Sequence, residues 1–236
     1  MIEHKKEFSI GLILTISFFV VLFIIYSPVF PGKRNGLEYA DMIFNRMAKG
    51  STYYIPAIME KNEKFIGKEI DVSITMKGAE EVEKVSRLYL KAGATIAIEE
   101  NNIKIAGDLG TMLKSALADS DAMFKNKGDE VSERYGYDEK EAMYYWWLSF
   151  HAMDKALKKQ KKFAEAAFIL DVLSKAVEPG YNFYGIKGES AREHAGILTG
   201  SLVFYVIYTL WWGFAIYFLF EGFGLKMVKA KEKKEV

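Results

Sequence analysis

The chain of 236 residues contains no cysteine, only three histidines and only four prolines. The lack of cysteine excludes disulfides, iron–sulfur clusters, thiolate zinc sites and covalently attached haem. The net charge is +1, so the charge balance gives no reason to expect a nucleic-acid partner. No phosphate-binding loop, nucleophile elbow or zinc-protease motif occurs. We therefore predict no catalytic residue, no metal and no cofactor, and an enzyme is the least favoured class.

Charged side chains are also missing from two long stretches, residues 8–32 and 196–220. About 20 apolar residues suffice for a helix to cross the hydrocarbon core of a bilayer, so both stretches are long enough. The first is too long for the apolar part of a cleaved signal peptide, and no small-residue cleavage pattern follows it. We expect transmembrane helices at 8–30 and 196–221, the first of them an uncleaved signal anchor in the lipid bilayer.

Basic residues near the two stretches predict the orientation. Five lysines follow the second stretch, whereas few basic residues precede it. Cytoplasmic flanks of membrane helices carry an excess of lysine and arginine. We therefore expect a two-pass protein of the cell (inner) membrane, with cytoplasmic tails at 1–7 and 222–236 and an extracytoplasmic α+β domain at 31–195.

The clearest strand signal in this domain lies at 69–76, where apolar and polar residues alternate. Such alternation is typical of a strand with one buried face. A helix is expected at 78–92, and apolar residues on both sides of Asn101 and Asn102 predict a β-hairpin. Asp108 is placed to cap a further helix that ends at Phe124.

The order strand, helix, strand, strand, helix matches most of a split βαβ unit. With a right-handed crossover, we expect strand 69–76 to lie parallel to strand 102–106, with strand 94–98 at the edge. This arrangement hosts many functions, so it identifies none.

The remainder of the domain is predicted to be mainly helical, with short helices at 36–49 and 54–65 and a polar loop at 126–136. Asp138 and Glu141 predict a capping box. Residues 138–177 then form either one long helix or a helical hairpin that turns at the lysines of 158–162. In both cases Pro179 and Gly180 are expected to end the helix.

Aromatic residues supply the first candidate site. Tyr144, Tyr145, Trp146 and Trp147 are consecutive and cover every side of a helix. Because one core cannot enclose all four, some are expected to face a partner protein, a membrane surface or a ligand pocket. The equally weighted alternative is an ordinary core with one exposed ring. His194, expected at the outer mouth of the second membrane helix, is a further possible contact on the outer surface.

The second membrane helix supplies the other candidate site. Gly196 and Gly200 form a small-xxx-small pair, which allows another backbone to approach closely. Tyrosine and tryptophan prefer the membrane interfaces, yet here they also lie near mid-span. One neighbouring helix cannot easily cover every one of these residues, so we predict contact with a second helix, unless tyrosine hydroxyls bond their own helix or snorkel. The residues concerned are Gly196, Gly200, Ser201, Tyr205, Tyr208, Trp211 and Trp212.

These features favour a non-catalytic accessory or scaffold subunit of a membrane protein complex, with partners that are other subunits or further copies. One alternative is an extracytoplasmic ligand sensor, which would signal through a partner because the cytoplasmic tail is short. Another is an oligomeric scaffold whose layout resembles that of the polysaccharide co-polymerases, although the second apolar stretch lacks their proline-rich motif.

Overall fold

The computed structural model describes residues 2–225, and the chain forms two compact units. The terminal unit consists of Met1–Phe44 and Ser190–Val236, and the central unit of Asn45–Glu189. Most of the tail expected to be basic and cytoplasmic, residues 226–236, lies outside the described residues.

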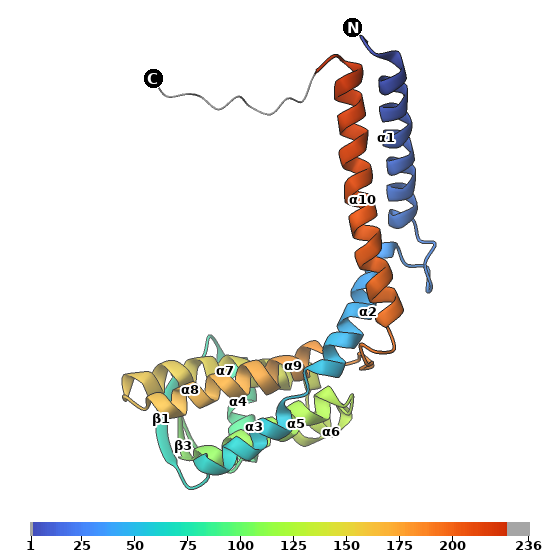
Figure 1. Cartoon of the computed structure of the whole chain (residues 1–236). Helices are drawn as coiled ribbons and strands as arrows, with labels where there is room; N and C mark the ends of the chain where they lie inside the picture. Colours follow the sequence, from blue (N-terminus) through green and yellow to red (C-terminus); the bar gives the residue numbers. More distant parts are fainter. Residues whose placement is uncertain (1, 226–236) are drawn as a thin grey trace, which may run out of the picture. The chain divides into compact units, whose positions relative to one another are not determined.

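Two long helices, α1 (Lys5–Tyr26) and α10 (Ala195–Gly222), pack side by side in the terminal unit (Figure 1). Both are long and apolar enough to span a membrane. Only 11% of the apolar stretch of α1 and 6% of that of α10 is buried, so neither serves as the core helix of a globular domain. A further helix, α2 (Gly36–Ser51), begins in this unit and continues into the central one.

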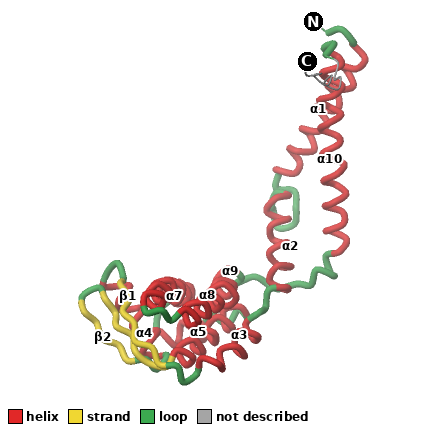
Figure 2. The backbone as a smooth tube through the Cα atoms, turned by 60° about the vertical axis from the view of Figure 1, so that its left-hand side comes forward, coloured by secondary structure: helices red, strands yellow, loops and turns green. Residues whose placement is uncertain are grey.

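The central unit contains a three-stranded sheet in the order β1-β3-β2 (Figure 2), built from β1 (Glu69–Thr75), β2 (Thr95–Glu99) and β3 (Asn102–Asp108). The predicted order, with β2 at an edge, is confirmed. The predicted parallel pairing of β1 with β3 is wrong, because both pairings are antiparallel. The short hairpin reverses β3 relative to β2, and helix α4 (Ala79–Lys91) returns the chain so that β2 runs in the direction of β1. The strand between them must therefore oppose both.

One face of the sheet supports the core of the unit. Along β1, Ile70, Val72 and Ile74 are buried, while the residues between them are exposed. Helices α4 and α7 contact the sheet. The alternation in the sequence thus predicts correctly which side chains of this strand are buried.

The helix predicted at 54–65 is confirmed as α3 (Ile55–Asn62) with a 3₁₀ turn at Glu63–Phe65, and the helix predicted to end at Phe124 is confirmed as α5 (Leu109–Phe124). The structure adds one short helix, α6 (Asp129–Tyr135). The predicted cap of α5 is confirmed, since the Asp108 carboxylate accepts a hydrogen bond from the Thr111 N–H at 2.6 Å. The predicted polar loop at 126–136 is wrong. Helix α6 forms there because Val131 and Tyr135, one turn apart, are both buried.

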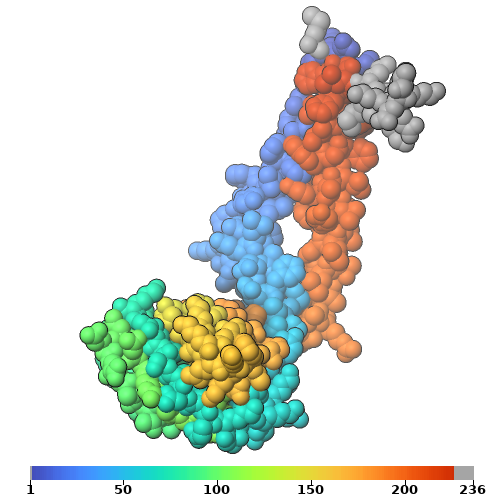
Figure 3. All heavy atoms as spheres, turned by 90° about the vertical axis from the view of Figure 1, so that its left-hand side faces the viewer, coloured from blue at the N-terminus to red at the C-terminus, as the bar shows by residue number. Residues whose placement is uncertain are grey.

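Residues 138–177 form a helical hairpin of α7 (Glu139–Lys159) and α8 (Phe163–Val172) rather than one long helix. The predicted capping box is confirmed only in its first half: the Asp138 carboxylate accepts hydrogen bonds from the N–H groups of Lys140 and Glu141, while the Glu141 carboxylate pairs with Lys84 at 2.6 Å. The chain turns after α7, where Lys161 adopts a left-handed conformation with φ 62°. The Gln160 side chain in this turn donates to the Asp71 carbonyl at 2.7 Å, and in Figure 3 yellow atoms of the hairpin lie beside teal atoms from earlier in the chain. The turn thereby covers part of the free edge of β1.

The helix after α8 does not end at Pro179 and Gly180 as predicted. A π-helical turn (Leu173–Val177) leads directly into α9 (Glu178–Asn182). Pro179 occupies the first turn of α9, where proline is tolerated. Gly180 allows close packing, because a Cβ atom built on it would lie 2.9 Å from the Ser120 carbonyl oxygen of α5.

Candidate functional site

Aromatic packing joins the two long helices of the terminal unit. The Phe18 ring of α1 lies 4.4 Å from the Tyr208 ring and 4.6 Å from the Trp212 ring, centroid to centroid. Trp211 meets the same ring edge-on at 6.3 Å, and its indole N–H donates to the Leu14 carbonyl at 3.1 Å. Helix α1 therefore contacts three of the predicted aromatic residues at once.

The glycines that allow this packing are Gly11 and Gly222, not the predicted pair. A Cβ atom on Gly11 would lie 2.6 Å from the Leu219 nitrogen, and one on Gly222 would lie 2.6 Å from the Phe8 Cα. A Cβ atom on Gly196 or Gly200 would meet nothing within 4 Å. Sequence reasoning missed the first pair because only the antiparallel register of the two helices places each glycine opposite a backbone.

Part of α10 is not covered by the residues the structure describes. Tyr205 is 67% exposed, Ser201 is also exposed, and the predicted glycine pair lies on the same N-terminal half. A shallow groove of about 550 Å³ runs along the helix pair. It is lined by Leu14, Ile207, Leu210, Trp211, Phe214 and Phe218.

The four consecutive aromatic residues of α7 divide between core and surface. Trp146 is fully buried and Tyr145 is 7% exposed, whereas Tyr144 is 43% and Trp147 37% exposed. The expectation that the core cannot enclose all four is confirmed. His194 lies in the other unit, immediately before α10.

The buried half of this cluster belongs to a polar network that the sequence did not reveal. The completely buried Asp119 carboxylate accepts hydrogen bonds from the Trp146 indole at 2.8 Å and the Tyr135 hydroxyl at 2.5 Å, and it pairs with Arg134. Burial raises the pKa of Asp119, and the bonds from Tyr135 and Trp146 oppose that shift. The network fixes the face of α7 that packs on α5.

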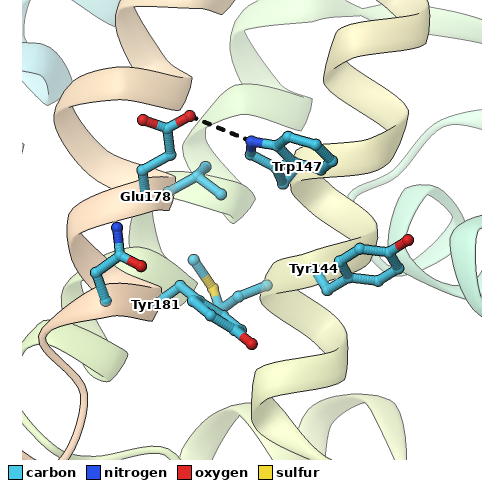
Figure 4. Close-up of a pocket in the computed structure, with 7 residues that line it drawn as sticks. Tyr144, Trp147, Glu178 and Tyr181 are labelled. Atoms are coloured by element: carbon cyan, nitrogen blue, oxygen red, sulfur yellow. Dashed lines mark hydrogen bonds between the residues drawn. The ribbon is translucent and has the colours of Figure 1, made fainter.

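The exposed half lines a cleft between α7 and α9 with a volume of about 330 Å³. We call it the aromatic cleft; its lining residues are Met143, Tyr144, Trp147, Val177, Glu178, Tyr181 and Asn182. In Figure 4 the Glu178 carboxylate and the Trp147 indole point toward one another from the two helices. The indole N–H donates to the carboxylate at 3.2 Å. The cleft thus combines aromatic rings with one carboxylate.

A buried lysine near the start of the central unit bonds to groups near its end. The Lys49 side chain, on a residue only 5% exposed, donates to the carbonyls of Ile186 (2.5 Å) and Phe183 (3.0 Å) and to the Asn126 side chain (3.0 Å). Burial lowers the pKa of this lysine. We call these contacts of Lys49 with Asn126, Phe183 and Ile186 the clamp, because they join the beginning of the central unit to its end. Sequence reasoning missed this clamp because its partners are backbone carbonyls far along the chain.

Neighbouring contacts strengthen the clamp. Arg46 forms an ion pair with Glu189 at 3.0 Å, and the Glu189 N–H donates to the Arg46 carbonyl at 3.0 Å. A side chain on Gly50 would collide with the Glu189 carbonyl oxygen. The beginning and the end of the central unit are therefore held together at several points.

Within residues 2–225, no group of three or more histidine, aspartate and glutamate residues is arranged to hold a metal ion. The arrangement suits binding and packing: an aromatic cleft with one acid in the central unit, and an incompletely covered helix pair in the terminal unit. Comparison with known proteins returns no similar family model, curated protein or solved structure.

Proposed function

We propose that this chain is a two-pass membrane protein with cytoplasmic termini and an extracytoplasmic domain, and that it serves as a non-catalytic accessory subunit of a membrane protein complex. The observation that carries the proposal is the uncovered half of α10. There, Tyr205 is 67% exposed and a Cβ atom on Gly196 or Gly200 would meet nothing within 4 Å.

The depth of Tyr205 in the helix supports a protein partner. The 28 residues of α10 extend about 42 Å at 1.5 Å per residue, against a hydrocarbon thickness of about 30 Å. A centred helix places Tyr205 about one turn from the membrane midpoint. A phenol hydroxyl there lacks water, so a partner that accepts its hydrogen bond is stabilising. The open glycine pair lies on the same N-terminal half but on a different face, because Gly200 and Tyr205 are about 140° apart around the helix. This pair admits a second backbone.

Two substitutions test the partner. Gly200→Leu should block close approach of another helix, and Tyr205→Phe should remove the hydroxyl. Both variants should insert normally but lose associated subunits when the complex is extracted from its native membrane and its mass is measured. Gly213→Leu is the matched control for Gly200→Leu, because a Cβ atom at Gly213 also meets nothing within 4 Å while the residue lies about 140° around the helix from Gly200. An unchanged native mass in both test variants would remove the support for a partner helix.

Reporter fusions test the topology separately. Fusions at both termini should report a cytoplasmic location, and a fusion in the loop near Asn126 an extracytoplasmic one. A fusion after Val236 that reports an extracytoplasmic location would contradict the two-pass arrangement.

The aromatic cleft favours a second candidate, an extracytoplasmic ligand sensor that signals through a partner. A cleft of about 330 Å³ lies at the lower end of the usual size for small-molecule sites. The same mass measurement addresses the scaffold alternative, since a ring of identical chains without other subunits would favour the polysaccharide co-polymerase layout.

A further inference from the structure

The aromatic cleft contains the carboxylate of Glu178. Among residues 2–225, the ion pairs within 4.0 Å do not include Glu178. Its recorded side-chain bond comes from the Trp147 indole, a neutral donor, at 3.2 Å. The residue is half-buried between two helices, where water screens its charge less than at an open surface. The geometry points to a cationic ligand, and we propose that the cleft binds a small organic cation that carries a quaternary ammonium group.

Aromatic rings around the carboxylate favour a cation over a neutral ligand. Tyr144, Trp147 and Tyr181 all line the cleft and are 37–43% exposed, so their rings are accessible. The faces of tryptophan and tyrosine carry negative electrostatic potential and attract cations, and tryptophan does so most strongly. The Tyr144 and Trp147 rings lie nearly parallel, 6.2 Å apart.

The scarcity of polar groups favours a methylated ammonium over a primary one. Besides Glu178, the lining offers the Asn182 amide and the tyrosine hydroxyls, while the floor consists of the buried Met143 and Val177. A primary ammonium is strongly hydrated and needs several acceptors to replace its water. Methyl groups on the nitrogen spread the charge, and their carbon surface packs against rings and against the thioether.

The surrounding structure holds the cleft open in advance of binding. Trp146, next to the cleft residue Trp147, is anchored to the buried Asp119, and Gly180 seats α9 directly on α5. His151 packs edge-on against the Trp147 ring at 4.5 Å. A preformed site loses less conformational entropy on binding than one that must assemble.

Three related ligands test whether binding depends on the positive charge of the ligand and on the methyl groups of its nitrogen. Choline carries the quaternary ammonium, 3,3-dimethyl-1-butanol is its neutral isostere, and ethanolamine is its primary-amine counterpart. We expect calorimetric titration of the full chain, in a maltoside detergent free of choline head groups, to give saturable binding of choline at least about tenfold tighter than that of either analogue. Equal affinity for the neutral isostere, or no saturation by choline up to about 10 mM, would overturn the proposal.

Substitutions then locate the site. Trp147→Leu and Glu178→Gln should each weaken choline binding about tenfold or more, without changing the native mass that reports the partner helix. Tyr54→Leu and Glu130→Gln are the matched controls, because both residues are exposed elsewhere in the central unit, and they should leave the affinity unchanged. Binding that survives both cleft substitutions would place choline elsewhere and refute the site.

The quaternary ammonium can belong to a free solute or to a phospholipid head group. Glycerophosphocholine in the same titration separates these sources, since it presents the complete head group without acyl chains. If glycerophosphocholine binds more tightly than choline, the ligand is a phospholipid head group. If it binds more weakly, the ligand is a free solute, and the loss of affinity reflects repulsion between the added phosphate and the Glu178 carboxylate.

Discussion

The terminal unit and the central unit use their apolar side chains in opposite ways. In the central unit, strands and helices enclose a continuous core in which even Trp146 and Phe150 are completely buried. In the terminal unit, large residues such as Leu202, at 68%, stay exposed along α10. The first pattern is that of a domain folded in water, and the second is the one expected of helices whose solvent is hydrocarbon.

Polar groups differ between the units in the same sense. In the central unit, the buried Asp119 and Lys49 bond to groups distant in the sequence. In the terminal unit, the hydroxyls of Thr15 and Thr209 bond to carbonyls one turn back in their own helix. Helices in lipid must satisfy their polar groups without water, and such local bonds do so. The comparison therefore predicts that substitutions disturb the central unit more than the helix pair.

The largest effect is expected from a charge placed in the central core. Ile74 is 2% exposed on β1, so Ile74→Asp should cost about 4 kcal/mol or more and unfold the central unit. Limited proteolysis of the detergent-solubilised chain should then cut within 45–189 while α1 and α10 stay protected by the micelle. Ser73→Asp is the matched control, since the neighbouring side chain lies on the exposed face. A folded Ile74→Asp variant would contradict the core assignment.

The next effect concerns the clamp. Lys49→Met should remove a charged donor from the carbonyls of Phe183 and Ile186 and from the Asn126 side chain, which destabilises the central unit by about 2–3 kcal/mol. Hydrogen exchange should accelerate at the amides of Gly185 and Glu189, which bond to Asn126 and Arg46. Lys127→Met, at an exposed ion pair with Glu130, should change neither. Unaltered exchange in the first variant would show that Lys49 does not hold the ends together.

A smaller effect is expected in the helix pair. Gly222→Leu inserts a side chain where a Cβ atom would lie 2.6 Å from the Phe8 Cα, so the helices should separate at that end at a cost of about 1–3 kcal/mol. The chain has no cysteine, so spin labels on cysteines at the exposed Ile13 and Tyr217 would report the separation. Gly213→Leu should leave that distance unchanged. A narrow, unshifted distance in both variants would mean that close approach is not needed.

Local patterns in the sequence predicted much of this fold. Alternation identified β1, and the caps at Asp108 and Asp138 are confirmed because each depends on residues within one turn. The direction of β3 was wrong because strand direction depends on how three strands combine. Helix α6 was missed because only two of its residues, Val131 and Tyr135, are buried, too few for a clear periodic signal.

The candidate sites were predictable only in part. Consecutive aromatic residues on α7 showed that some must face outward, which Tyr144 and Trp147 do. Nothing local showed that Glu178, 31 residues after Trp147, bonds to its indole. The clamp could not be predicted for the same reason. From the sequence, Lys49 is expected at the surface, and only the fold brings the carbonyls of Phe183 and Ile186 to it. Contacts between residues far apart in the sequence require the tertiary fold.

The smallest effect is expected from loss of the hydrogen bond of Trp211. It gives the sharpest comparison, because the same substitution, tryptophan to phenylalanine, can be made in both units. The Trp211 indole donates to the Leu14 carbonyl at 3.1 Å, and the Trp146 indole donates to the buried Asp119 carboxylate at 2.8 Å. The Leu14 carbonyl also accepts a hydrogen bond from the Ser17 hydroxyl of its own helix at 3.0 Å, and hydrogen bonds between membrane helices average only about 0.6 kcal/mol. Asp119, in contrast, loses a donor to a buried charge, which costs about 1.5–3 kcal/mol.

We therefore expect Trp146→Phe to lower the unfolding midpoint of the central unit clearly, while Trp211→Phe leaves the label distance in the helix pair almost unchanged. Trp212→Phe serves as the control for lost ring area, because the Trp212 ring packs on Phe18 and Phe19 and no hydrogen bond of its indole is recorded within residues 2–225. If Trp211→Phe separated the helices more than Trp212→Phe did, the single hydrogen bond would outweigh aromatic packing. The helix pair would then resemble the central unit in depending on specific polar contacts.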